Sequence, residues 1–375
     1  MRFGEEDPEL KFSLLTPMWN TNPTHLEELI LSCLAQSYPN WELILQDDCS
    51  KDASHHSTAE KYARLDSRIK FFVSSENQGI SGGRNAAIKN ATGGFLAILD
   101  HDDLLHPQIL GIYARKLREN PSINFIYSNE CKVSEDSKFL KDFFTKPCFD
   151  LQTLLRTNYI CHFTAIRRSV YEMAKNSDFE YYNPQYDGVE DHEFFLRCAL
   201  KNSIEPHHVP LMGYLWRISS TSTAGDLANK PWVVELGCKM VEEKAKEIYK
   251  GAQCKAIPAN VTKGERLFRI RFEALPASKK IAVLVPFKNK AEMTIRCLES
   301  LESQTTAANC QVILINNFSE EPSLKKVRHW SESSRKHRYE IMDYAGAFNY
   351  SAMNNAALKM IDRDVEAVLY LNNDV

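Results

Sequence analysis

The stretch Phe95-Leu-Ala-Ile-Leu-Asp-His-Asp-Asp103 decides the fold of this chain. Its first five residues are apolar, as is typical of a short strand that is buried on both faces. The apolar run stops at Asp100, and Asp102 and Asp103 follow within the same turn. A buried strand that ends in carboxylates predicts an α/β protein whose polar site lies at the carboxyl edge of the sheet.

The residues before this stretch repeat the same alternation of apolar run and helical pattern. Strands are predicted at 12–16, 41–45, 69–73 and 95–99, with helices between them. Such βαβ units form a mostly parallel central sheet flanked by helices. The strand ends carry Pro17, Asp47, Asp48, Asp100 and Asp102. Ligands bind beyond the carboxyl ends of such strands, so we expect the site there.

Composition excludes several classes of protein. The chain has 375 residues and a net charge of −3, which gives no basic footprint for nucleic acid. No apolar run approaches the roughly 20 residues that cross a bilayer, so membrane contact is expected to be peripheral. The ten cysteines are scattered without a CxxC pair, which favours reduced thiols in a cytoplasmic protein.

A second copy of the pattern begins near Ile281. Ile281–Pro286 repeats Phe12–Pro17, and Asn316-Asn317 stands where the first copy has Asp47-Asp48. Leu371-Asn-Asn-Asp374 repeats Leu99-Asp-His-Asp102 at a similar offset of about 270 residues. The predicted organisation is therefore a domain over 1–250, a linker over 251–279 and a partial second module over 280–375.

The acidic strand ends have both a functional and a structural interpretation. Asp100 and Asp102 supply two oxygen ligands of the type that Mg²⁺ and Mn²⁺ prefer, although short acidic turns are common without a metal. Asp47 and Asp48 can accept hydrogen bonds from a nucleotide, or can cap a helix or turn.

Two further segments carry candidate residues. Gly79–Gly83 reads as a glycine-rich turn before a helix that includes Arg84, and such a turn favours phosphate, although its spacing is not that of a dinucleotide site. Asp191 lies at a predicted helix start, where it can act as a general base or stabilise the helix. The adjacent pairs His55-His56 and His207-His208 lack helical metal-site spacing and are expected at the surface or at strand ends.

In this order, the motifs resemble glycosyltransferase family 2, an inverting family with a GT-A fold. The resemblance covers about residues 12–223 and rests on the following segments: Leu14–Pro17, Leu45–Asp52, Asn77–Ser81, Arg84–Ala87, Leu99–Asp103 and Glu190-Asp191. Tyr214–Thr223 also resembles a segment of bacterial polysaccharide enzymes with tandem modules, including rhamnan and O-antigen types.

The resemblance implies a role for each matching residue. Pro17 and Asp48 would border the nucleotide base with Asp47 beside them, and Arg84 and Asp100 would approach the donor. Asp102 would bind the divalent metal, Mn²⁺ or Mg²⁺, and Asp191 would deprotonate the acceptor. The implied reaction is transfer of a hexosyl or deoxyhexosyl group from a nucleotide-diphosphate sugar to a glycan or lipid-linked glycan, at the inner face of the membrane.

The chain departs from the family pattern at three places. Many members carry a histidine near the position of Ser219 or Ser220 as a further metal contact, and this chain has none. Cys49 replaces a frequent glycine. In the second copy, asparagines replace most of the acidic residues, and the copy stops before any acceptor half or base. We therefore expect either a fragment of a longer tandem enzyme, which we favour, or a degenerate module that serves docking.

Two other functions compete with catalysis. A non-catalytic scaffold that binds nucleotide or glycan would explain the incomplete second copy. A nucleotidyltransferase would need a basic phosphate-binding loop after the first strand, and Thr16–Asn20 lacks one.

Overall fold

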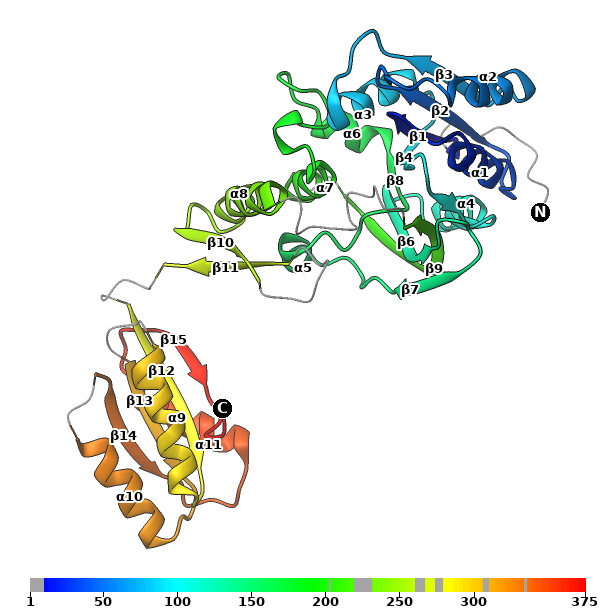
Figure 1. Ribbon diagram of the computed structural model, residues 1–375. Coiled ribbons are helices and arrows are strands. Elements are labelled where there is room, and N and C mark those ends of the chain that lie inside the picture. Colours follow the sequence, from blue (N-terminus) through cyan, green and yellow to red (C-terminus); the bar gives the residue numbers. More distant parts are fainter. Residues whose placement is uncertain are drawn as a thin grey trace. The chain divides into compact units, whose positions relative to one another are not determined.

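The computed structural model describes residues 10–201, 204–218, 231–259, 267–273, 279–305, 310–333 and 336–375. The chain divides into two compact units, Met1–Phe272 and Glu273–Val375 (Figure 1). Within the described ranges, no helix combines the length and the hydrophobicity that a membrane span requires.

The first unit is built on a nine-stranded mixed sheet. Its strands are β1 (Phe12–Met18), β2 (Trp41–Asp47), β3 (Ile69–Val73), β4 (Phe95–Ile98), β5 (Leu104–Leu105), β6 (Phe125–Val133), β7 (Leu140–Phe144), β8 (Thr164–Arg167) and β9 (Pro206–Arg217). The order is β3-β2-β1-β4-β8-β6-β9-β5, and β7 pairs with β6. The first four strands are parallel, whereas β8 runs antiparallel between β4 and β6.

Helices cover both faces of this sheet. Neighbouring residues of a strand point to opposite sides, and here both sides carry apolar side chains that must be covered. Leu14 packs with α1 (Pro23–Leu34), α2 (His56–Leu65) and α4 (Ile109–Glu119). Leu15 packs in the other core, to which the following helices contribute: α3 (Gly79–Asn90), α5 (Leu151–Arg156), α6 (Arg168–Ala174), α7 (Glu190–Leu200) and α8 (Pro231–Ile248). The short helix η2 (Pro184–Tyr186) precedes α7.

The sequence explains where several elements begin and end. Asn22 caps α1 by accepting a hydrogen bond from the Thr24 backbone, and Pro23 occupies the first helical position, where its missing N–H costs nothing.

The expected turn at Gly79–Gly83 is instead the first part of α3. Within the expected linker 251–279, β10 (Cys254–Pro258) and β11 (Phe268–Phe272) form an antiparallel hairpin.

The second unit has a smaller parallel sheet in the order β14-β13-β12-β15. Its elements are β12 (Lys280–Phe287), α9 (Ala291–Gln304), β13 (Cys310–Asn316), α10 (Glu321–Glu332), β14 (Arg338–Asp343), α11 (Tyr350–Ala357), η4 (Leu358–Met360) and β15 (Val365–Tyr370). This order matches β3-β2-β1-β4 of the first unit.

The turn after the second strand is built by the same hydrogen bonds in both units. The Ser50 backbone N–H donates to Asp47, and Ser319 donates in the same way to Asn316. Cys49 and Phe318 both adopt left-handed backbone, with φ of 56° and 53°. The left-handed conformation also explains why glycine suits the position of Cys49.

A buried carboxylate fixes the other end of the first strands. Glu42 is 1% exposed and accepts hydrogen bonds from Ser13, Thr92, Lys11 and Lys70. Burial alone would raise the pKa of this carboxyl, but the hydrogen bonds from Lys70, Ser13, Thr92 and Lys11 bring it down to about 2. The ionised form is therefore part of the folded state.

We expect Glu42→Gln to destabilise the first unit by about 2 kcal/mol, because charge-assisted hydrogen bonds are lost and buried donors remain. In the wild type this stabilisation is complete above the ordinary carboxyl pKa of 4.5 and is lost as the pH falls toward about 2. Hydrogen exchange of β1 and β2 peptides measures the change locally.

The matched control is Glu60→Gln, because Glu60 is exposed on α2 and forms an ion pair with Arg64. Exposed ion pairs contribute little to stability, so hydrogen exchange of β1 and β2 in this variant should stay near the wild-type rate. Equal protection of β1 and β2 in both variants would contradict the anchoring role of Glu42.

Candidate active site

The carboxyl ends of β1 and β2 bring Pro17 and Asp48 together against α3. A Cβ atom added to Gly83 would lie 3.6 Å from the Pro17 Cβ and 3.7 Å from the Asp48 Cβ. The Asp48 carboxylate accepts the Gln78 backbone N–H at 2.9 and 3.0 Å. Burial raises the pKa of Asp48, and repulsion from Asp47 and Asp187 adds to that effect against the hydrogen bonds from Gln78 and Gly79.

Asp47 is turned into the protein, away from the position that the sequence predicts for a donor ligand. Its side chain is 1% exposed, and its oxygens are hydrogen-bonded to Ser50, His55 and His56. Residues that follow one another along a strand point to opposite sides, so Asp47 and Asp48 have separate environments. In this structure the Asp47 carboxylate is held by these three residues, and its contact with a donor stays a prediction.

The acidic turn after β4 is anchored by Asp103. This buried carboxyl accepts hydrogen bonds from the Tyr214 hydroxyl at 2.5 Å and from the Arg217 backbone at 2.7 Å. Burial, followed by repulsion from Asp102 and Asp100, raises the pKa of Asp103 well above its ordinary value. Three carboxyl groups thus converge on one turn, and a bound cation would relieve their repulsion.

Asp100 and Asp102 present carboxylates from this turn. The Asp100 side chain is 36% exposed and lies 3.4 Å from the His162 ring. Within the described ranges, the Asp102 carboxylate makes no hydrogen bond or ion pair, although its backbone oxygen accepts from Arg217. Oxygen donors of this kind fit Mg²⁺ or Mn²⁺, with substrate phosphates completing the coordination. The sequence position expected for a further ligand, Ser219 or Ser220, lies outside the described residues.

The amino-terminal end of α3 already holds an anionic side chain. Asp187 accepts the Ser81 backbone N–H at 3.1 Å and lies 2.8 Å from where a Cβ of Gly79 would be. A carboxylate there satisfies the unpaired N–H groups and the positive end of the helix dipole. The phosphate that the glycine-rich segment predicts would have to share this position with Asp187.

Arg84, in contrast, is buried and has hydrogen-bond donors without a partner among the described residues. It lies on α3, is 6% exposed, and pairs through Nη2 with Glu190 Oε1 at 2.9 Å. Its Nε and Nη1 are buried and have no hydrogen-bond partner among the described residues. Burial lowers the pKa of Arg84, but the neighbouring Glu190, Tyr182, Asp191 and Asp100 raise it above the ordinary value, so the guanidinium stays charged.

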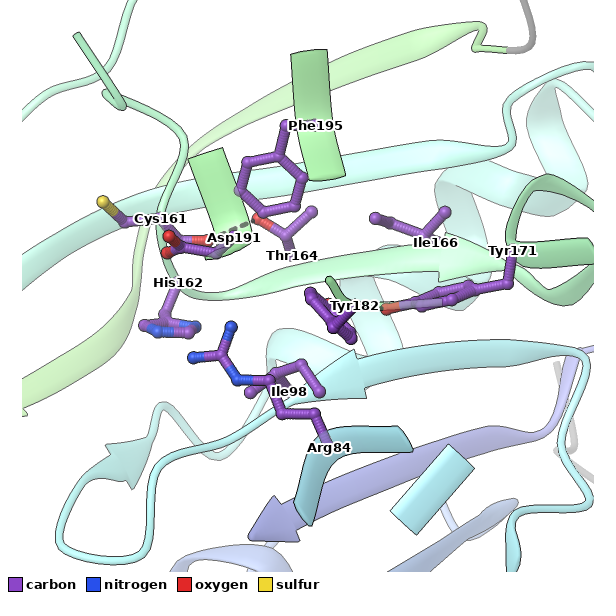
Figure 2. A pocket seen from close by; sticks show the side chains of 10 residues that line it. All are labelled: Arg84, Ile98, Cys161, His162, Thr164, Ile166, Tyr171, Tyr182, Asp191 and Phe195. Carbon is purple, nitrogen blue, oxygen red and sulfur yellow. Dashed lines mark hydrogen bonds between the residues drawn. The ribbon is translucent and has the colours of Figure 1, made fainter. Parts of the chain in front are cut away.

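Asp191 faces Arg84 across a pocket that neither helix forms alone. The pocket is lined by Arg84, Ile98, Cys161, His162, Thr164, Ile166, Tyr171, Tyr182, Asp191 and Phe195 (Figure 2). Burial raises the pKa of Asp191, but Arg84 and then His162 outweigh that effect, and the net direction is downward. Asp191 is therefore ionised at neutral pH.

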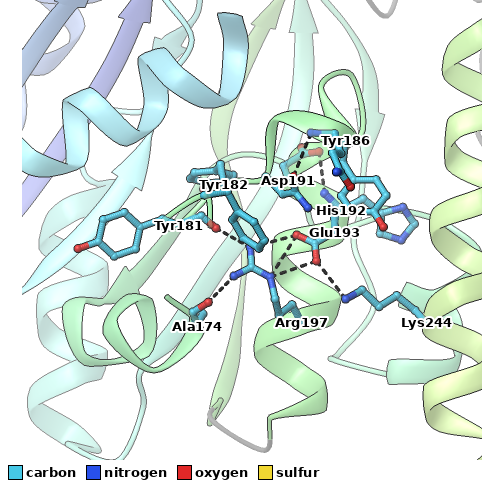
Figure 3. A network of polar contacts seen from close by, with 12 residues as sticks. Ala174, Tyr181, Tyr182, Tyr186, Asp191, His192, Glu193, Arg197 and Lys244 are labelled. Carbon is cyan, nitrogen blue, oxygen red and sulfur yellow. Dashed lines mark hydrogen bonds and ion pairs between the residues drawn. The ribbon is translucent and has the colours of Figure 1, made fainter. Parts of the chain in front are cut away.

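The position of Asp191 depends on buried contacts along α7 (Figure 3). Arg197 donates to the Ala174 and Tyr181 carbonyl oxygens and pairs with Glu193. Glu193 also pairs with Lys244 of α8 at 3.0 Å. These contacts fix the axis of α7, and Asp191 lies in its first turn.

His162 is the site residue that sequence reasoning missed. It comes from the loop before β8. The ring contacts Asp100, and its charge also influences Asp191, so it lies between the donor-side and acceptor-side carboxylates. No spacing rule connects a loop histidine to acidic residues that lie 62 positions before it and 29 after it.

The first unit combines a mixed sheet with carboxylates at the ends of its parallel strands. The family model described as "Glycosyl transferase family 2" matches residues 13–173 and 282–375. The chain therefore belongs to glycosyltransferase family 2, and the expected GT-A-like fold is confirmed, although its central sheet is mixed and not mostly parallel.

Relatives among curated proteins extend over most of the chain. It is 30% identical over 365 residues to the uncharacterized protein y4gI of Sinorhizobium fredii, covering 97% of the chain and 38% of that protein. It is 25% identical over 364 residues to the O-antigen biosynthesis protein RfbC of Myxococcus xanthus, covering 97% of the chain and 27% of that protein. The chain thus spans less than two fifths of either relative.

Solved structures are similar at lower identity. TarS of S. aureus, residues 1–349 in complex with UDP-GlcNAc, aligns with a TM-score of 0.48 and 19% identity, covering 64% of this chain and 73% of that one. The mannosyltransferase PcManGT of Pyrobaculum calidifontis, in complex with GDP-Man and Mn²⁺, aligns with a TM-score of 0.45 and 16% identity, covering 64% of each chain.

We expect Glu190→Gln to destabilise the first unit by about 3 kcal/mol, because it leaves Arg84 as an uncompensated buried charge. The double variant Arg84→Met/Glu190→Gln should regain much of that loss. Urea unfolding of the first unit measures the free energy of unfolding of the single and the double variant. Together with the single variant Arg84→Met, these values form a double-mutant cycle that gives the coupling energy between the two side chains. Additive losses would show that the two side chains do not depend on each other.

Proposed function

We propose that the first unit transfers a sugar from a nucleotide-diphosphate sugar to an acceptor hydroxyl, with inversion at the anomeric carbon. The observation that carries the proposal is the pairing of a charged Arg84, which has two buried N–H groups without partners, with an ionised Asp191 in the same pocket. One group suits a diphosphate, and the other suits a proton acceptor.

The donor side of the proposal rests on Arg84, Asp48 and Pro17. A guanidinium donates in a planar fork that matches phosphate oxygens. Glu190 pairs with Nη2, whereas Nε and Nη1 have no hydrogen-bond partner among the described residues. Pro17 and Asp48 lie beside the same helix, where they would border the nucleotide base.

The acceptor side rests on Asp191. In the proposed step, the carboxylate takes the proton of the acceptor hydroxyl while that oxygen forms a bond to the anomeric carbon. The bond between the anomeric carbon and the diphosphate oxygen breaks, and its electron pair leaves with the nucleoside diphosphate. Attack opposite the leaving group inverts the anomeric centre, as in inverting glycosidases with water replaced by the acceptor.

Asp100 and Asp102 would hold the divalent metal in this proposal, with Asp102 as its direct ligand. A bound Mg²⁺ or Mn²⁺ supplies charge neutralisation at the leaving diphosphate. Asp103 contributes by keeping the turn attached to β9 through Tyr214 and Arg217.

We assign transfer to the first unit because the second keeps only Asp374, at the place of Asp102, among the corresponding strand-end carboxylates. Asn316, Asn317 and Asn372 occupy the places of Asp47, Asp48 and Asp100. RfbC is named for O-antigen biosynthesis, and WfgD of Escherichia coli, 37% identical over 33% of this chain and 47% of that protein, is named as a glucosyltransferase acting on a diphosphoundecaprenol acceptor. We infer a hexosyl or deoxyhexosyl donor and a glycan or lipid-linked glycan acceptor in bacterial surface polysaccharide synthesis, at the cytoplasmic side of the membrane.

Asp191→Asn should reduce turnover by about 10²- to 10⁴-fold, because an amide cannot accept the proton. Release of nucleoside diphosphate from a panel of sugar donors with Mn²⁺ measures the change. The control is Asp178→Asn, which makes the same substitution at an exposed position and should keep wild-type turnover. Nucleotide binding without turnover in the wild type would instead support the scaffold function.

Arg84→Lys should weaken UDP or GDP binding about tenfold, because lysine keeps the charge but loses the fork of donors. Calorimetric titration with the diphosphate and with the matching nucleoside separates the phosphate contact from the base contact. The nucleoside, which has no phosphate, should bind both proteins alike. An equal loss for both ligands would indicate a distorted fold and not a lost phosphate contact.

A further inference from the structure

Two adjacent histidines converge on one carboxylate at the end of β2. His55 Nε2 lies 3.1 Å from Asp47 Oδ1, and His56 Nε2 lies 3.1 Å from Asp47 Oδ2. Potential ligand atoms of all three residues lie within 4.8 Å of one another, and this is the one group of its kind found in the described part of the chain. These histidines are expected at the surface or at strand ends, whereas His55 is fully buried at the start of α2.

The separation of these atoms fits a shared metal ion. Zn²⁺ binds imidazole nitrogen and carboxylate oxygen at about 2.0–2.2 Å, so two ligands of a tetrahedral ion lie about 3.3 Å apart. Each imidazole nitrogen lies 3.1 Å from a different Asp47 oxygen, which is close to this spacing. One ligand atom from each of the three residues lies within 4.8 Å of the others, so modest side-chain movement would bring all three onto one ion. The His56 side chain is 26% exposed, so solvent can reach the remaining coordination position.

The carboxylate is held in place by groups other than the histidines. Ser50 donates to Asp47 through its hydroxyl at 2.5 Å and through its backbone N–H at 3.1 Å. Ligating carboxylates in metal sites are commonly oriented by such hydrogen bonds. Both histidines come from the start of α2, which makes the site a link between the turn after β2 and that helix.

The ligand types also indicate which metal would bind. Nitrogen ligands select zinc-like borderline ions over Mg²⁺.

We propose that Asp47, His55 and His56 bind one Zn²⁺ ion, at a site separate from the Asp100–Asp102 turn. The ion would join β2 to α2 directly behind Asp48 and so hold the turn that borders the proposed nucleotide position. Its role is structural, because the proposed proton transfer at Asp191 and the phosphate contact at Arg84 involve none of its ligands.

The test is metal binding by untagged full-length protein that has been stripped with a chelator. Titration with Zn²⁺ against a chromophoric chelator should show one tight site in the wild type. His56→Asn should weaken that site by at least about 100-fold, since loss of a ligand exceeds the loss of an orienting partner. Ser50→Ala should weaken it about tenfold for the same reason.

Two controls locate the ion. His329→Asn removes an exposed histidine of the second unit, and Asp102→Asn changes the acidic turn, and both should retain the tight site. His56 is used because it is partly exposed, and circular dichroism confirms that its variant folds. Visible absorption of the Co²⁺ form should change in His56→Asn alone.

Absence of a tight site in the wild type would overturn the proposal, as would a site that survives His56→Asn or disappears in Asp102→Asn. None of these measurements uses a sugar donor. Failure of the zinc site would therefore leave the proposed transfer activity untouched, and loss of transfer in Asp191→Asn would leave the zinc site untouched.

Discussion

The buried ion pair between Arg84 and Glu190 is the contact on which the site depends. Arg84 belongs to α3, which follows the nucleotide-side strands, and Glu190 starts α7, about a hundred residues later. A buried guanidinium needs an opposite charge nearby, because desolvation of an unpaired ion is expensive. The ion pair between Arg84 and Glu190 places the next residue, Asp191, beside Arg84. The positive charge of Arg84 then keeps Asp191 ionised. One electrostatic requirement thus assembles two distant segments and sets the protonation of the proposed base.

Neighbouring residues at the strand ends show how backbone geometry divides chemical roles. Asp47 and Asp48 have the same side chain, yet Asp47 is enclosed by Ser50, His55 and His56, whereas Asp48 lies against Gly83 and the start of α3. The turn after β4 makes a similar division, with Asp103 bound to β9 and Asp100 half exposed. In the turn after β4, one carboxylate therefore holds the backbone while another stays partly exposed.

The sequence predicted the parts of the fold that local patterns determine. The apolar runs at 12–16, 41–45, 69–73 and 95–99 became β1 to β4, and the repeat near Ile281 became a second parallel sheet in the same order. Asp48, Asp100 and Asp191 could be named because each stands at or beside an element boundary, whereas Pro17 lies inside β1 and Arg84 inside α3, and both were named from motifs. His162 and Asp187 could not, because their positions result from loops that pack across the sheet. The different environments of Asp47 and Asp48 could not be predicted either, because an acidic pair does not reveal which side chain points into the protein.

The turn that follows the second strand in each unit has a consequence for how such modules can diverge. An amide oxygen at Asn316 accepts the serine backbone N–H as well as the carboxylate of Asp47 does. Exchange of aspartate for asparagine therefore costs the backbone nothing, and a duplicated copy can lose its charges by drift while its shape persists. A module can therefore keep its architecture while it loses its chemistry. Only the charged side chains show whether the chemistry has been kept.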